Sequence, residues 1–181
     1  MSWIQTFTGK KFFPLSPRAE DVDIRDVAHA LSLTCRFTGH CREFYSVAQH
    51  SVLTVGVVRG RLLKNLKERP PDKRFLLSAL LHDAAEAYMA DIARPVKRQL
   101  AGVEEIEERL LKTVAERFGA YWPLPPAVKW ADNVMLVTER RDLMAETAED
   151  WGLREKPLRK RIEAWPPRRA EAEFLELFDV L

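Results

Sequence analysis

Apolar residues recur every three or four positions along most of this chain of 181 residues, which is the spacing of one face of an α-helix. No segment alternates apolar and polar residues as a half-buried strand would, and no repeat or shift in composition marks a second domain. A chain of this length with 46% hydrophobic residues can bury one core of useful size. We therefore predict an all-α fold, a single domain over residues 1–181 built as a bundle of about six helices.

Helix start and stop signals divide the chain into these helices. Asp23, Ser46 and Asp72 are good N-cap residues ahead of apolar runs, and Asp72 follows two prolines. The helix after Asp72 is expected to run unbroken over residues 72–88, and its LLSALL centre is apolar nearly all round, which predicts burial. The remaining helices are expected at residues 103–118, 127–150 and 169–180.

Charge and composition exclude several classes of protein. The 29 basic and 27 acidic residues nearly cancel, so a nucleic-acid polymer is not an expected partner. No uncharged apolar run approaches the roughly 18–20 residues that cross a bilayer, so no membrane association is expected. The N-terminal residues lack the apolar stretch of a secretory signal, and two cysteines fall short of a disulfide framework. We therefore expect a cytoplasmic protein.

Ionisable residues embedded in apolar helices are the main sign of chemistry. His50, the pair His82–Asp83 and Asp132 each lie among apolar neighbours, on three separate predicted helices. Burying such groups is costly unless something compensates their charge, and a divalent cation would do so. Two imidazoles and two carboxylates suit one divalent metal ion: Co²⁺, Mn²⁺, Fe²⁺, Mg²⁺ or Zn²⁺. The alternative is a hydrogen-bonded core histidine at His82 with Asp83 paired locally.

Glu86 follows His82 by four residues, so on a continuous helix the two side chains share a face. A carboxylate beside a metal site can orient or deprotonate a water molecule, and we predict this role for Glu86.

The order of these residues resembles the signature of the HD-domain metal-dependent phosphohydrolases, which are all-helical enzymes that hydrolyse phosphate esters. The blocks RFTGHCREFYSVAQHS and LLHDAAEAYMADIARPVK resemble the branch with bacterial 5′-deoxynucleotidases, close to small phage enzymes that strip triphosphate from deoxynucleotides. The resemblance covers about residues 25–140. It implies His50, His82, Asp83 and Asp132 as metal ligands.

The same resemblance implies roles for residues around the metal. It implies the same role for Glu86, orienting or deprotonating the water, and Asp91 matches a family acid near the leaving group or the sugar. Arg36 occupies the position of a phosphate-binding arginine, and we expect Lys97 to contact phosphate as well. Two further residues are expected to bind substrate, Phe37, where some deoxynucleotidases place a tryptophan against the deoxyribose, and Pro95, beside the base.

The expected reaction is the conversion of a 2′-deoxynucleoside 5′-monophosphate to deoxynucleoside and phosphate. A deoxynucleoside triphosphate triphosphohydrolase remains an alternative, because Arg94, Lys97 and Arg98 would suit extra phosphates. A non-catalytic nucleotide-binding regulator is a more remote one. Of the remaining histidines, His29 is expected to be structural and His40 to lie near the substrate. The aromatic-rich termini favour a homo-oligomer.

Overall fold

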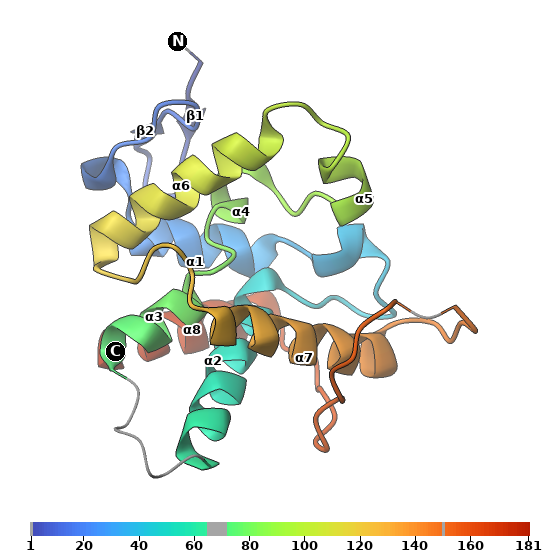
Figure 1. The fold of residues 1–181 in the computed structure, drawn as a ribbon. Helices are drawn as coiled ribbons and strands as arrows, with labels where there is room; N and C mark the ends of the chain where they lie inside the picture. Colours follow the sequence, from blue (N-terminus) through green and yellow to red (C-terminus); the bar gives the residue numbers. More distant parts are fainter. Residues whose placement is uncertain (1, 65–71, 150) are drawn as a thin grey trace.

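The computed structural model describes residues 2–64, 72–149 and 151–181. These residues form eight α-helices, which confirms the all-α class (Figure 1). The helices are α1 (Ile24–Leu33), α2 (Val47–Lys64), α3 (Lys73–Leu80), α4 (Glu86–Met89), α5 (Arg94–Lys97), α6 (Val103–Phe118), α7 (Pro126–Leu143) and α8 (Pro167–Val180). None of the helices in these ranges is long and apolar enough to cross a membrane.

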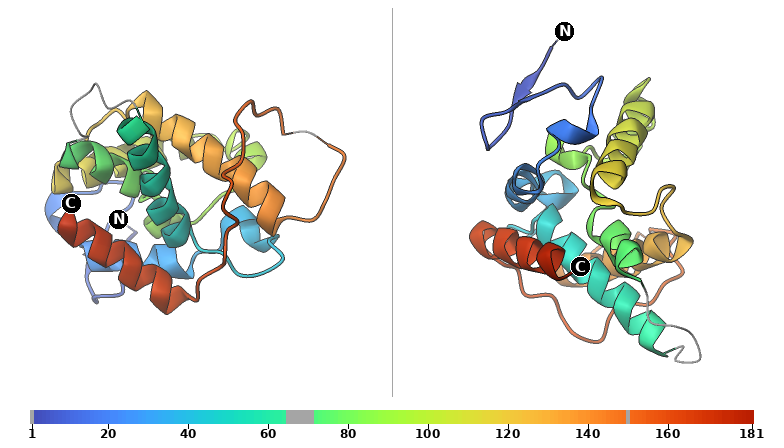
Figure 2. Two further views of the ribbon diagram at one scale, coloured as in Figure 1. Left: turned by 90° about the horizontal axis from the view of Figure 1, so that it is seen from below. Right: turned by 90° about the vertical axis from the view of Figure 1, so that its left-hand side faces the viewer.

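Helix α2 lies at the centre of the bundle. Helices α1, α3, α7 and α8 all pack against it, and the views in Figures 1 and 2 show α7 and α8 crossing α2 on opposite sides. The core they enclose is closely packed around fully buried side chains such as Leu31, Leu80, Met135 and Phe174. In the first half of α2, residues 47–55, no side chain is exposed, so a polar residue such as His50 is buried there.

The predicted N-caps are confirmed. The Asp23 carboxylate accepts a hydrogen bond from the backbone N–H of Arg25 at the start of α1. The Ser46 hydroxyl accepts from Gln49 N–H at the start of α2 (3.1 Å), and Asp72 accepts from Phe75 N–H at the start of α3 (2.8 Å). Each cap satisfies a backbone donor that the first helical turn leaves unpaired.

The prediction of one unbroken helix over residues 72–88 is wrong. Helix α3 ends at Leu80, and residues 81–85 form tight turns before α4 begins at Glu86. Two backbone hydrogen bonds in this segment join residues three apart, where an α-helix joins residues four apart. They run from Ala84 N–H to the Leu81 carbonyl and from Glu86 N–H to the Asp83 carbonyl, both 3.0 Å long. This break, together with the short helix α5, raises the number of helices above the expected six.

The helix predicted for residues 127–150 ends at Leu143. The Leu143 carbonyl accepts a hydrogen bond from Arg42 N–H (2.8 Å), and residues 145–149 are exposed, so no apolar face remains to support a further turn. Residue 150, the expected end of this helix, lies outside the described residues.

A small antiparallel sheet near the N-terminus was not predicted. Strands β1 (Ile4–Gln5) and β2 (Lys11–Phe12) have two residues each, too few to produce a visible alternation in the sequence. The hairpin covers one end of the core with the fully buried Phe12. Asp26 on α1 anchors it by accepting bonds from the backbone N–H and the hydroxyl of Thr8 (2.7 and 3.0 Å).

Candidate functional site

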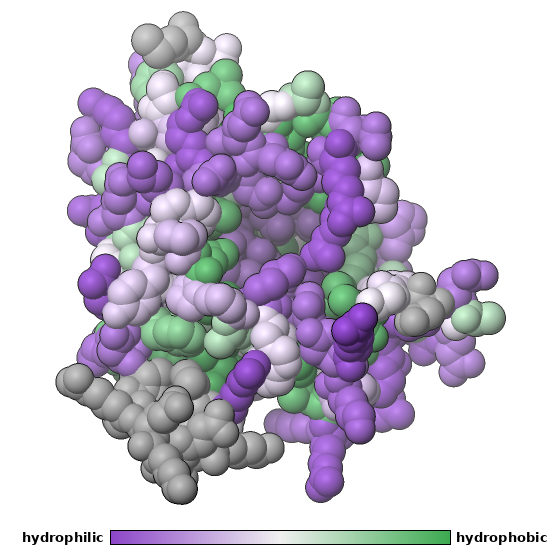
Figure 3. Space-filling view, viewed as in Figure 1, coloured by the Kyte–Doolittle hydropathy of each residue, from purple (hydrophilic) through white to green (hydrophobic). Residues whose placement is uncertain are grey.

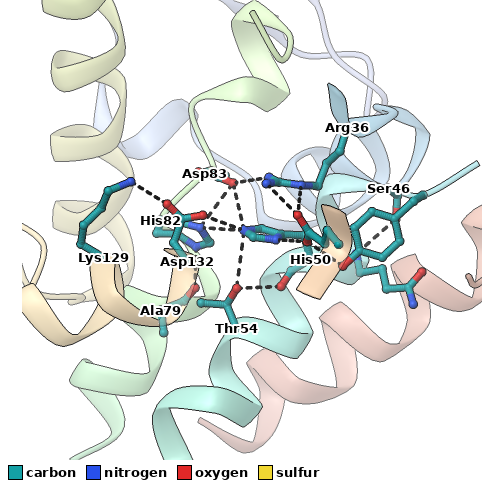
Figure 4. A network of polar contacts seen from close by, with 12 residues as sticks. Arg36, Ser46, His50, Thr54, Ala79, His82, Asp83, Lys129 and Asp132 are labelled. Atoms are coloured by element: carbon teal, nitrogen blue, oxygen red, sulfur yellow. Dashed lines mark hydrogen bonds and ion pairs between the residues drawn. The ribbon is translucent and has the colours of Figure 1, made fainter. Parts of the chain in front are cut away.

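The four predicted metal ligands meet between α2, α7 and the turn after α3 (Figure 4). His50 comes from α2, His82 and Asp83 from the turn, and Asp132 from α7. The Nε2 atom of His50 lies 3.2 Å from His82 Nε2, 3.6 Å from Asp83 Oδ2 and 3.5 Å from Asp132 Oδ1. Asp83 Oδ2 lies 3.3 Å from His82 Nε2. Segments up to 82 residues apart in sequence thus converge on one point.

These distances suit a shared metal ion. Donors about 2.1 Å from one ion stand about 3.0 Å apart at a right angle and about 3.4 Å apart at a tetrahedral angle. Ligand atoms of His50, His82 and Asp83 all lie within 4.8 Å of one another, and Asp132 approaches this group on the His50 side. Lys129 Nζ binds the other Asp132 oxygen, Oδ2, at 2.7 Å, which leaves Oδ1 facing His50. The donor set fits one divalent cation.

Hydrogen bonds hold both imidazoles with Nε2 toward the cluster. His82 Nδ1 lies 2.8 Å from the Ala79 carbonyl, and a carbonyl only accepts, so Nδ1 carries the proton and Nε2 is free to coordinate. His50 Nδ1 lies 2.6 Å from a carboxylate oxygen of Glu139. Both rings are buried, at 0% and 6% residue exposure for His50 and His82. Fixed rings of this kind are typical of metal sites.

Three charged side chains, Arg36, Glu139 and Asp132, act on the ring of His50. Burial and the nearby Arg36 lower its pKa, but the Glu139 and Asp132 carboxylates outweigh them and raise the pKa of His50 to about 9. Burial raises the pKa of Asp132, but the hydrogen bond and charge of His50 hold it well below its usual range. Without a cation, both ring nitrogens of His50 are therefore protonated at neutral pH, and metal coordination through Nε2 would release the proton on that atom.

Glu86 is the first residue of α4, directly after the turn that carries His82 and Asp83. The turn therefore places Glu86 beside the cluster. The prediction that His82 and Glu86 share one face of a continuous helix is wrong. The residue is 8% exposed, and its Oε2 has no hydrogen-bond partner among the described residues. Burial, reinforced by the charges of Asp83 and Asp91, raises the pKa of Glu86 to about 10. A buried, unpaired carboxyl of this kind is typical of a functional position.

One pocket of about 1180 Å³ joins most of the predicted site. Its volume suits a ligand of nucleotide size. Figure 3 shows this face hollowed and rimmed mainly by hydrophilic side chains. The predicted residues that line it are Arg36, Phe37, His40, Asp83, Glu86, Asp91, Pro95, Lys97 and Asp132.

The two predicted phosphate-binding residues differ in their surroundings. The Arg36 guanidinium is almost fully buried, and its Nη1 lies 3.2 Å from Asp83 Oδ2, at the edge of the metal cluster. Lys97 also lines the pocket, but its Nζ is paired with Glu107 Oε1 at 2.6 Å. Both residues are thus paired with carboxylates, but Arg36 is held beside the cluster, whereas Lys97 is held by Glu107.

The structure does not bring His29 to the cluster. Its Nδ1 lies 3.2 Å from Glu171 Oε2 on α8, and its ring stacks on Phe7 with centroids 3.7 Å apart. This arrangement joins the N-terminal hairpin to the helices. His40, by contrast, is an exposed residue at the edge of the pocket.

Sequence reasoning missed Glu139 and Trp151. Glu139 is fully buried on α7 beside His50 and Arg36, and it follows Asp132 by seven residues, a spacing that places both on one helical face. Burial by itself raises the pKa of Glu139, but the positive charges of Arg36 and His50 outweigh burial and hold this pKa below its usual value. Trp151 lines the pocket with its ring centroid 5.8 Å from that of Phe37, and no spacing in its loop signals this contact.

Comparison with known proteins finds close relatives. The chain is 38% identical to the uncharacterized protein YfdR of Escherichia coli (strain K12), over 100% of this chain and 96% of that protein. It is 36% identical to the uncharacterized protein RCAP_rcc00048 of Rhodobacter capsulatus, over 74% of this chain and 68% of that protein. No protein-family model matches the chain. The names of these relatives state no activity.

Proposed function

The chain belongs to the same protein family as Escherichia coli YfdR, and we propose that it is an HD-type phosphohydrolase that cleaves nucleotide phosphate esters with a divalent metal ion. The observation that carries this proposal is the convergence of two histidines and two aspartates at a pocket that also holds a buried arginine and an unpaired buried glutamate. Residues suited to hold an ion, bind a phosphate and accept a proton thus lie together at this pocket, which supports the proposal.

His50, His82, Asp83 and Asp132 would hold the ion. A bound divalent ion supplies Lewis acidity for a phosphoryl oxygen and lowers the pKa of a coordinated water. Arg36 then binds phosphoryl oxygens, since its guanidinium reaches Asp83 at the edge of the cluster and arginine pairs with phosphate through two N–H groups. A phosphate held there lies beside the cluster.

Glu86 accepts a proton from the attacking water. Its pKa of about 10 keeps the carboxyl protonated at neutral pH in the metal-free protein. Positive charge at the neighbouring cluster would favour the ionised carboxylate, which is the form of Glu86 that accepts a proton. Asp91, which also lines the pocket, would lie near the leaving oxygen or the sugar.

The charge of the pocket favours a monophosphate over a triphosphate. Glu104 and Glu107 line the wall that carries Arg94, Lys97 and Arg98, and Glu107 pairs with Lys97. This balance leaves less positive charge for β- and γ-phosphates. The substrate we propose is a 2′-deoxynucleoside 5′-monophosphate in the cytoplasm. A triphosphohydrolase, favoured by Arg94 and Arg98, is the second candidate. The exposed Trp3 and Phe7 support a homo-oligomer.

Product analysis by chromatography tests this function. Purified protein is incubated with ribo- and deoxynucleoside mono- and triphosphates, with Co²⁺, Mn²⁺ or Mg²⁺ and with EDTA as control. We expect deoxynucleoside and phosphate from monophosphates only with metal, and loss of metal retention and turnover in Asp83→Ala. Release of triphosphate would transfer the protein to the second candidate function. Turnover that persists in EDTA would contradict the proposal.

A further inference from the structure

A fully buried carboxylate connects the metal cluster with the phosphate-binding arginine. Glu139, on α7, has 0% exposure, and both of its oxygens are engaged. Oε1 lies 2.6 Å from His50 Nδ1 and accepts a bond from the Tyr45 hydroxyl at 2.9 Å. Oε2 lies 3.2 Å from both Nε and Nη2 of Arg36. One side chain thus contacts a predicted metal ligand and a predicted phosphate contact.

The contacts of Glu139 fix the orientation of the His50 ring and of the Arg36 guanidinium. His50 is held through Nδ1, and its other nitrogen, Nε2, faces Asp83 and Asp132. Arg36 is held through Nε and Nη2, and its remaining Nη1 lies against Asp83 Oδ2. In both cases the atom left over points at the cluster. A side chain that only filled space would not be expected to make hydrogen bonds that leave both of these nitrogens facing the cluster.

We propose that Glu139 is a positioning residue that fixes His50 for metal coordination and Arg36 for phosphate binding at the same time. The proposal rests on the function proposed above. A carboxylate that accepts from the second nitrogen of a coordinating histidine fixes the ring orientation and strengthens the ligand. Because the same carboxylate restrains Arg36, metal affinity and phosphate affinity depend on one side chain.

The test is Glu139→Gln, compared with Tyr45→Phe as the matched control. Gln has one accepting oxygen in place of two, so its NH₂ group must face either His50 Nδ1 or Arg36, which are both donors. Phe removes only the hydroxyl that donates to Oε1 and leaves the His50 and Arg36 contacts in place. The two variants thus change the same buried cluster, but only one of them disrupts the positioning contacts.

Two dissociation constants are measured, for Co²⁺ on the stripped protein and for inorganic phosphate on the Co²⁺-loaded protein. In Glu139→Gln we expect the Co²⁺ constant, the phosphate constant or both to rise by about 10- to 100-fold. In Tyr45→Phe we expect both within about threefold of wild type. If folded Glu139→Gln binds Co²⁺ and phosphate as tightly as wild type, the proposal is overturned.

Should Glu139→Gln fail to fold, Glu139→Asp replaces it. Asp keeps the charge but is one methylene shorter, so it cannot reach both partners, and one constant is still expected to rise about 10-fold. Wild-type values for both constants in folded Glu139→Asp would overturn the proposal. Binding needs no turnover, so a protein that binds Co²⁺ and phosphate but hydrolyses no nucleotide refutes the proposed function alone. A wild-type protein that binds no Co²⁺ refutes both.

Discussion

Replacing Glu86 by Gln is expected to stabilise the metal-free protein while abolishing its activity. In the folded state the carboxyl keeps its proton up to a pH of about 10, whereas in the unfolded chain it ionises near 4.5. A folded pKa above the unfolded value means that, as pH rises past 4.5, only the unfolded chain releases the proton. Ionisation of Glu86 in the unfolded chain therefore lowers the free energy of unfolding by about 1.4 kcal/mol per pH unit above 4.5, or up to about 3 kcal/mol at pH 7.

Gln cannot ionise and does not carry this penalty. Urea unfolding of EDTA-treated wild type and Glu86→Gln, from pH 4.5 to pH 8, measures the difference. We expect similar stabilities near pH 4.5 and a growing advantage of the variant toward pH 8, together with a loss of turnover of about 10²- to 10⁴-fold in metal-loaded protein. A stability difference that does not change with pH would refute the reasoning, because it would mean that Glu86 is ionised in the folded protein.

Four further substitutions have expected outcomes. Asp23→Ala removes the cap of α1 and should cost about 0.5–2 kcal/mol in urea unfolding at pH 7. Because its hydrogen bond to Arg25 lowers the pKa of Asp23, that stabilisation is present above the ordinary carboxyl pKa and should fade as pH falls below it. Trp151→Ala removes a pocket ring beside Phe37 and should raise KM for a deoxynucleotide about 10-fold in steady-state assays. Its KM for 2-deoxyribose 5-phosphate, which has no base, should stay unchanged, and an equal effect on both would exclude base stacking. Lys97→Ala should change the monophosphate KM less than about threefold, because this lysine pairs with Glu107 and not with a residue of the metal cluster, whereas Arg36→Ala should raise it more than about 10-fold, because Arg36 lies beside the cluster. A larger effect at Lys97 would show that it leaves Glu107 to bind phosphate.

The sequence was sufficient to predict those site residues that stand out from their sequence neighbours, because burying a polar side chain in an apolar segment costs free energy. His50, His82–Asp83 and Asp132 are polar residues inside apolar runs, and their burial follows from the helical pattern. The structure buries His50, His82 and Asp132, leaves the Asp83 side chain 21% exposed, and brings all four together. The caps at Asp23 and Asp72 were equally readable because capping depends on neighbours within three residues.

The parts that were missed depend on partners distant in sequence. Glu139 lies in the segment TERRDL, which looks like an exposed charged face, and it is buried only because His50 and Arg36 arrive from other segments. The break after Leu80 was hidden because apolar residues continue at helical spacing on both sides of it. Trp151 follows the helix in a loop, where periodicity carries no information about contacts.

Metal reconstitution of the stripped wild-type protein tests the central claim most directly. Co²⁺ is added stepwise to EDTA-treated protein, and bound metal and phosphate released from a deoxynucleoside monophosphate are measured on the same samples. The account predicts no release without metal and a rate that rises with occupancy until about one ion is bound per chain. Full turnover in the stripped protein, or a filled site that releases phosphate from no nucleotide, would contradict it.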